Sequence, residues 1–125
     1  MPVTGLEIQI RRPFANGQPF GDAGPFEEIR GVIRFTADPL HPYNQQITDI
    51  ERAPRNRDGC VEFESDIVIL RPSDPSRGSR RILFDVLNRG KRLALSYFNC
   101  AEREVIGPDT PADRPLEAGN GYLMR

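Results

Sequence analysis

Apolar and polar residues alternate along much of this chain, and this period of two residues predicts β-strands. Leu6, Ile8 and Ile10 alternate with polar neighbours until Pro13, which ends the first predicted strand. Similar patterns, some short, recur further along. The predicted strands cover residues 6–12, 28–36, 47–53, 60–71 and 82–87.

Residues 82–87 differ from the other predicted strands because they are apolar almost throughout. Such a run is typical of a strand that is covered on both faces of a sheet. Asp85 alone interrupts it, and a carboxylate in that position needs a partner, which nearby arginines could supply. Asp58-Gly59, which precedes the strand at 60–71, predicts a tight hairpin turn with Gly59 at positive φ.

Composition narrows the class of protein. The 125 residues include 11 glycines and 12 prolines, which indicates one turn-rich and largely β domain. With 17 basic and 18 acidic residues, the chain has no general attraction for nucleic acid or for a membrane. No apolar run has the length of a membrane span and no signal peptide is recognisable, so we expect a cytoplasmic protein.

Six basic residues lie close together in the sequence, and such a cluster could bind the phosphates of a nucleic acid. They are Arg77, Arg80, Arg81, Arg89, Lys91 and Arg92. Few aromatic residues lie among them, so we expect no nucleic-acid partner.

The pattern after residue 90 predicts less regular structure. Residues 91–98 favour a short helix or an extended segment, residues 100–115 a surface loop, and residues 115–118 the start of a helix.

Candidate catalytic and metal-binding residues are few. Cys60 and Cys100 suit neither a disulfide framework nor a zinc site, and we expect both to be small buried thiols. His41, the only histidine, lies between prolines in a loop, so a Cys–His pair is disfavoured. Glu62, Glu64 and Asp66 share one face of a predicted strand, where we expect a solvated surface rather than a metal site. We predict no metal and no cofactor.

A series of short motifs runs through most of the chain. In order, they are Gly24-Pro25-Phe26-Glu27, Gly31-Val32-Ile33, Asp38-Pro39, Asn44, Ile47-x-Asp49, Ala53-Pro54-Arg55-Asn56, Gly59, Val61-Glu62-Phe63, Leu70-Arg71-Pro72, Asn88-Arg89-Gly90 and Gly119-Asn120-Gly121-Tyr122-Leu123-Met124. As a set, they resemble the N-terminal part of the bacterial α/β-hydrolase domain-containing proteins. The resemblance covers the chain from about Leu6 onward.

The resemblance implies an α/β fold with a mixed, α/β-hydrolase-like sheet, of which residues 1–125 form an incomplete, mostly β, N-terminal portion. It implies serine-dependent hydrolysis of an ester or related acyl bond in a small-molecule substrate. Family members carry the nucleophile beyond the matched region, and this sequence contains no Gly-x-Ser-x-Gly. We therefore expect the chain to be inactive alone, with no catalytic residue of its own.

By the same resemblance, residues 82–87 are the third strand of the hydrolase sheet. Asn88, Arg89 and Gly90 then form the loop that supplies one backbone N–H to the oxyanion hole. The alternative at this position is a simple turn, with Arg89 paired to Asp85 or to solvent. The alternative for the whole chain is a small non-enzymatic, β-rich partner-binding domain, and its unpaired strands predict self-association.

Overall fold

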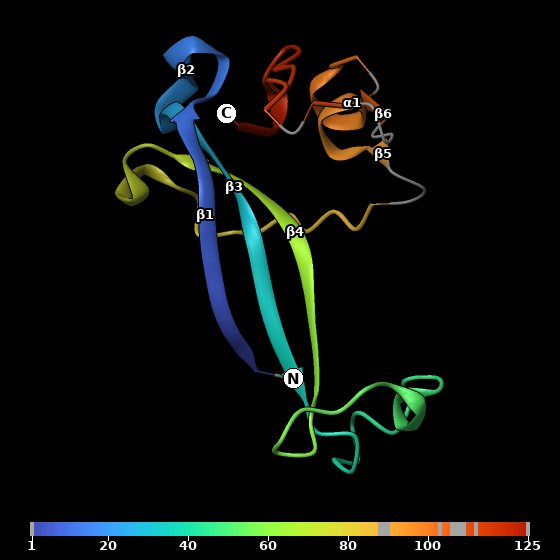
Figure 1. Ribbon diagram of the computed structural model, residues 1–125. Coiled ribbons are helices and arrows are strands. Elements are labelled where there is room, and N and C mark those ends of the chain that lie inside the picture. The colour runs from blue at the N-terminus through green and yellow to red at the C-terminus, as the bar shows by residue number, and fades with distance from the viewer. Residues whose placement is uncertain (1, 88–90, 103, 106–109, 112, 125) are drawn as a thin grey trace. The chain divides into compact units, whose positions relative to one another are not determined.

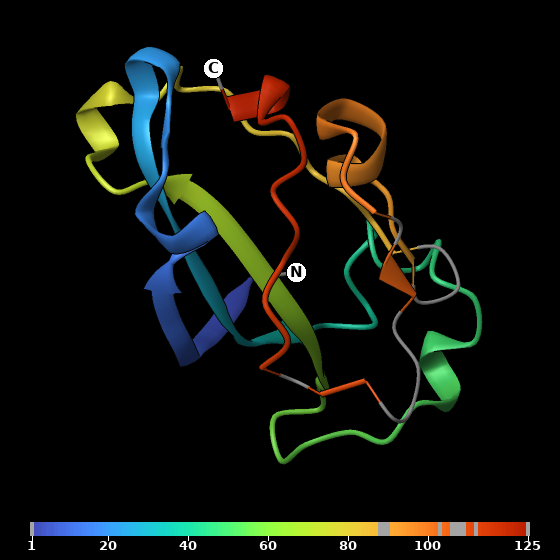
Figure 2. The same cartoon turned by 90° about the horizontal axis from the view of Figure 1, so that it is seen from above.

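The computed structural model describes residues 2–87, 91–102, 104–105, 110–111 and 113–124. Its main feature is an antiparallel sheet with three long strands. These are β1 (Val3–Pro13), β3 (Gly24–Ala37) and β4 (Val61–Pro72). β3 pairs with both β1 and β4, and the three run side by side (Figures 1 and 2). The chain is thus mostly β, as the alternating pattern predicts.

The remaining elements are short. β2 (Pro19–Phe20) pairs antiparallel with the start of β3, and β5 (Lys91–Arg92) pairs antiparallel with β6 (Glu104–Val105). The only α-helix in the described part of the chain is α1 (Ala94–Asn99), which overlaps residues 91–98, for which the sequence favours a helix or an extended conformation. Five 3₁₀ turns complete the described elements: η1 (Phe14–Gly17), η2 (Gly21–Ala23), η3 (Ile50–Arg52), η4 (Pro75–Arg77) and η5 (Tyr122–Met124).

The prediction of a strand at residues 47–53 is wrong. This segment consists of bends and turns, including η3, and Asp49, which directly precedes η3, has φ 58° in the left-handed region. Local hydrogen bonds replace strand pairing here. The Asn44 side chain, which is buried, donates to the Asp38 carbonyl oxygen at 2.8 Å, and Ile50 packs into the interior.

The prediction of a strand at residues 82–87 is also wrong for the described structure. The segment has no regular secondary structure and all six residues are exposed, with Ile82 at 92% and Phe84 at 79%. A strand exists only where a neighbour accepts its backbone hydrogen bonds, and no described residue provides that neighbour. The predicted helix start at residues 115–118 is likewise absent, since these residues are irregular.

Contacts divide the chain into two compact units. The first contains residues 1–10 and 29–68, and the second contains residues 11–28 and 69–125. In the first unit, the rings of Phe35 and Phe63 stack with centroids 4.9 Å apart. Gly31 lets β3 approach β1 closely, because a Cβ there would lie only 1.9 Å from the Glu7 carbonyl oxygen. In the second unit, three aromatic residues form part of the core: Phe14, Phe20 and Phe26. The centroid of the Phe20 ring lies 5.9 Å from the centroid of each of the other two rings.

The predicted turn before β4 forms, with Gly59 at positive φ, but the predicted hairpin does not. Gly59 has φ +78°, and its N–H donates to the Asn56 carbonyl oxygen at 3.0 Å. The Asn56 side chain accepts hydrogen bonds from the N–H groups of Asp58 and Cys60. This turn leads into β4 from the irregular segment before it, so it is not the end of a two-stranded hairpin.

Candidate functional site

The residues predicted to form an oxyanion loop, Asn88, Arg89 and Gly90, lie outside the described residues. Their two flanks are described: the exposed segment 82–87 before them, and β5 followed by α1 after them. The site can therefore be built from these flanks.

Asp85 connects the two flanks. Its Oδ2 accepts hydrogen bonds from the backbone N–H groups of Leu93 and Ala94, both at 3.0 Å. Leu93 directly precedes α1 and Ala94 is its first residue, and backbone N–H groups at a helix start have no partner within the helix and attract negative charge. The sequence correctly indicates that Asp85 needs a partner. Among the described residues, Asp85 hydrogen-bonds to these N–H groups at the start of the helix, and Arg89, the arginine named as an alternative partner, lies outside the described residues.

Side chains of both flanks surround an open hollow of about 230 Å³, which we call the aromatic hollow. Its lining residues are Leu83, Phe84, Asp85, Leu93, Ala94, Tyr97 and Phe98. Three of the seven are aromatic, and Asp85 contributes the single charged group. The arrangement suits a small ligand with an apolar body, since drug-sized sites usually exceed about 300 Å³.

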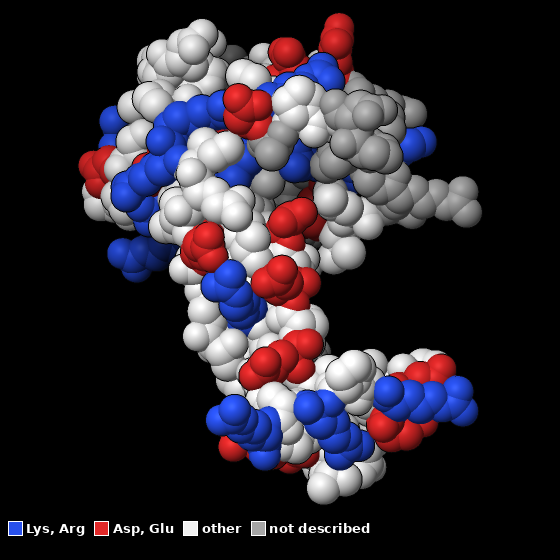
Figure 3. Space-filling model, viewed as in Figure 1, with Lys and Arg blue, Asp and Glu red and all other residues white. Residues whose placement is uncertain are grey.

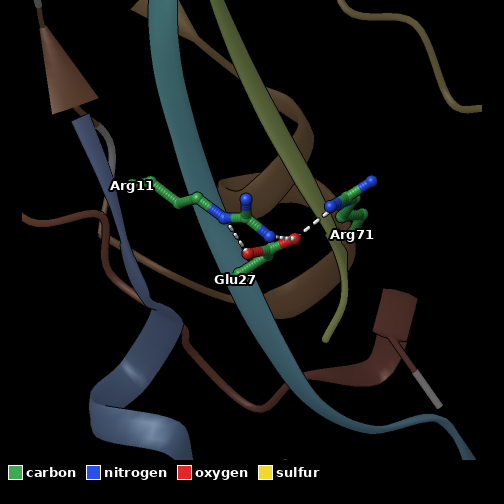
Figure 4. A network of polar contacts seen from close by, with 3 residues as sticks. All are labelled: Arg11, Glu27 and Arg71. Atoms are coloured by element: carbon green, nitrogen blue, oxygen red, sulfur yellow. Dashed lines mark hydrogen bonds and ion pairs between the residues drawn. The ribbon is translucent and has the colours of Figure 1, made fainter. Parts of the chain in front are cut away.

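A second polar cluster surrounds Glu27, a residue of the first motif (Figure 4). Arg11 donates to the Glu27 carboxylate from Nε at 2.7 Å and from Nη2 at 3.2 Å, and Arg71 donates from Nε at 2.5 Å. The hydrogen bonds from Arg11, and then those from Arg71, hold the pKa of Glu27 below its usual range. Glu27 also raises the pKa of Arg11. The carboxylate therefore joins β1, β3 and β4 in one network.

Glu28, the next residue, makes the matching contact on the other face of the sheet, because consecutive strand residues point to opposite faces. Arg12 donates to both of its carboxylate oxygens at 3.2 Å, and also to the Asp113 carbonyl oxygen at 2.7 Å. The arginines thus compensate the negative charges of Glu27 and Glu28, two carboxylates that are buried in the sheet. Sequence reasoning missed both networks, although two adjacent acids opposite two adjacent arginines were a signal.

Asn99, at the end of α1, is fully buried and holds the last motif of the chain. Its Oδ1 accepts a hydrogen bond from Leu123 N–H at 2.7 Å, and its carbonyl oxygen accepts one from Asn120 N–H. The packing requires glycine on both sides of Asn120. A Cβ on Gly119 would lie 2.0 Å from the Asn99 carbonyl oxygen, and one on Gly121 would lie 2.2 Å from the Phe20 ring.

The thiols and the histidine show no catalytic arrangement in the described residues. The prediction that both cysteines are buried is wrong, since Cys60 is half-buried and Cys100 is exposed. Cys100 follows α1 in the left-handed region, a helix end that leaves its side chain at the surface. His41 is exposed, and its Nδ1 accepts a hydrogen bond from the Tyr43 N–H at 3.3 Å rather than from a serine or a thiol.

The three carboxylates of β4 form a solvated face, as predicted. Glu62, Glu64 and Asp66 are all exposed. Glu62 accepts a hydrogen bond from Asn56, and Glu64 pairs with Arg34. Across the described residues, no three potential metal ligands gather at one place. On the face shown in Figure 3, basic and acidic side chains are interspersed along the strands.

Comparison with protein-family models, curated proteins and solved structures finds no match to this chain. Within the described residues, no helix is long and apolar enough to cross a membrane.

Proposed function

We propose that this chain is the N-terminal portion of a bacterial, cytoplasmic, serine-dependent α/β-hydrolase that cleaves an ester or related acyl bond in a small molecule. The observation that carries the proposal is the order of the elements around residues 88–90. An apolar segment without regular structure comes before them, the short strand β5 and then α1 follow, and Asp85 hydrogen-bonds to the start of α1. An α/β-hydrolase has a strand, a loop and a helix in this order where its oxyanion loop lies, and we propose that residues 82–87 take the place of the strand.

The exposure of residues 82–87 supports this proposal. Burying a large apolar side chain contributes about 1.5–3 kcal/mol, so the exposure of Ile82, Phe84 and Val86 leaves a large driving force unused. The central strand of an α/β sheet uses that driving force, because neighbouring strands and covering helices enclose it. We propose that residues 82–87 become such a strand when the rest of the hydrolase sheet pairs with them.

The role proposed for Asn88, Arg89 and Gly90 follows from this placement. A loop after the third strand supplies one backbone N–H to the oxyanion hole, and a glycine there permits the close approach of a substrate oxygen. Asp85 holds the start of α1 and so limits the span that the loop must cross. The serine nucleophile and its base are assigned to other residues of a longer protein, since covalent catalysis needs both groups in contact.

The test is to read the gene beyond the codon for Arg125 and to express the whole open reading frame. We expect a protein with a Gly-x-Ser-x-Gly motif that hydrolyses p-nitrophenyl acetate and reacts with a fluorophosphonate at that serine. The 125-residue chain is the matched control and should do neither. A complete protein that has no fluorophosphonate-reactive serine would contradict the proposal.

The alternative is a non-enzymatic, β-rich domain that binds a partner through the same exposed apolar segment. An exposed apolar patch of this kind marks interaction surfaces in soluble proteins. A stop codon directly after Arg125, together with a stable dimer in sedimentation experiments, would favour this alternative and the self-association that accompanies it.

A further inference from the structure

The aromatic hollow combines two features that the proposed oxyanion loop does not use. Phe84, Tyr97 and Phe98 bring three aromatic rings to its lining, and Asp85 brings a carboxylate. All three aromatic residues are exposed. The negative faces of aromatic rings attract cations, and a neighbouring carboxylate adds to that attraction.

The hydrogen bonds of Asp85 leave part of its carboxylate available. Oδ2 accepts both backbone N–H groups of α1, whereas Oδ1 accepts no hydrogen bond from the residues that the structure describes. Among the described residues, no basic side chain lines the hollow. The described lining is therefore apolar and aromatic with one negative charge, which complements a cation that carries apolar groups.

We propose that the aromatic hollow binds an alkylated ammonium group, such as the trimethylammonium group of choline. A volume of about 230 Å³ holds such a head group but is too small for most drug-sized ligands. A methylated ammonium suits the site better than a primary amine because its methyl groups contact the rings while its charge faces Asp85. Quaternary ammonium ions are recognised in this way by clusters of aromatic side chains.

This inference does not depend on the proposed function, because binding is measured on the 125-residue chain without any ester. The inference concerns the conformation of residues 83–85 in the 125-residue chain, where their side chains and those around α1 line the hollow. In a completed hydrolase sheet, a strand at residues 82–87 would place Phe84 and Asp85 on opposite faces, so the hollow belongs to the 125-residue chain.

The test is an NMR titration of the ¹⁵N-labelled chain with choline chloride, with sodium chloride at equal ionic strength as the reference. The amides of Leu93 and Ala94 should shift, while those of β4 should not. We expect a millimolar Kd, because exposed contacts between cations and rings are individually weak. The neutral carbon analogue 3,3-dimethylbutan-1-ol has the same shape without the charge, and it should bind at least about fivefold more weakly.

Two variants test the two features separately. Asp85→Asn retains a side-chain oxygen for the helix start but removes the charge, so it should weaken choline binding by about fivefold. Phe84→Leu keeps the apolar lining without the ring, lies outside α1, and should also weaken binding. The proposal is overturned if choline shifts no amide around the hollow, if the neutral analogue binds equally well, or if both variants bind choline as the unchanged chain does.

Discussion

Replacing Glu27 by glutamine should lower the free energy of unfolding by more than any exposed change of the same type. The variant keeps the size of the side chain but removes the charge that faces Arg11 and Arg71. The carboxylate side chain is 11% exposed, whereas those of the two arginines are 58% and 43% exposed. Solvent therefore screens part of the interaction, and we expect a loss of about 1–2 kcal/mol rather than the roughly 3–5 kcal/mol of a fully buried pair.

The assay is urea denaturation of the 125-residue chain, followed by circular dichroism. Glu64→Gln is the matched control, because Glu64 also pairs with an arginine of the same sheet but its side chain is 65% exposed. The midpoint should fall clearly for Glu27→Gln and hardly at all for Glu64→Gln, with an unchanged slope. Equal midpoints for the two variants would refute the argument that the Glu27 network stabilises the sheet.

The same network predicts how stability depends on pH. The pKa of Glu27 is lower in the folded chain than in the unfolded chain, where it is about 4.3. The unfolded chain therefore takes up the proton first as the pH falls. The contribution of the network is fully present above the unfolded pKa and is lost as the pH falls through the folded pKa. The difference between the unchanged chain and Glu27→Gln should accordingly be constant near neutral pH and shrink below about pH 4.

The remaining predictions concern the glycines, catalysis and association. Gly121→Ala should destabilise the chain by about 2 kcal/mol or more, because the added Cβ would overlap the Phe20 ring. The control Gly59→Ala is also at positive φ but in open space, so it should cost only about 1 kcal/mol. Equal melting temperatures for the two variants would contradict the packing of Gly121 against Phe20. The purified chain should not hydrolyse p-nitrophenyl acetate above background, and turnover that disappears in His41→Ala would show that a catalytic group was missed. The chain should self-associate in sedimentation experiments, and Phe84→Ser should reduce that association; a monomer whose amides in residues 82–87 exchange slowly would contradict it.

Local pattern determined the three long strands. Alternation with a period of two residues predicted segments 6–12, 28–36 and 60–71, and the structure contains β1, β3 and β4 at these places. The Asp58-Gly59 step likewise indicated a turn with a positive φ at its glycine. Such features depend on residues that are close in the sequence, so a single chain is enough to reveal them.

Tertiary structure decided which apolar segments became strands. Residues 47–53 and 82–87 have suitable composition, but a strand also needs a neighbouring backbone, and their composition could not show that the described residues provide none. The candidate site shows the same division. The sequence indicated that the carboxylate of Asp85 requires a partner, whereas only the folded chain could identify the N–H groups at the start of α1.

The polar networks of the candidate site depend on contacts between residues that are distant in the sequence. Glu27 contacts Arg11 and Arg71, which lie 16 and 44 positions away. The charges in the sequence indicate that these groups need partners, but the pairing of β3 with β1 and β4 decides which partners they contact. Asn99 in the same way reaches the glycine motif about 20 positions later. The sequence alone thus determined the local conformations and the polar groups that need partners. The register of the sheet and the packing of α1 decided which partners those groups found, because only they bring distant residues within hydrogen-bonding distance.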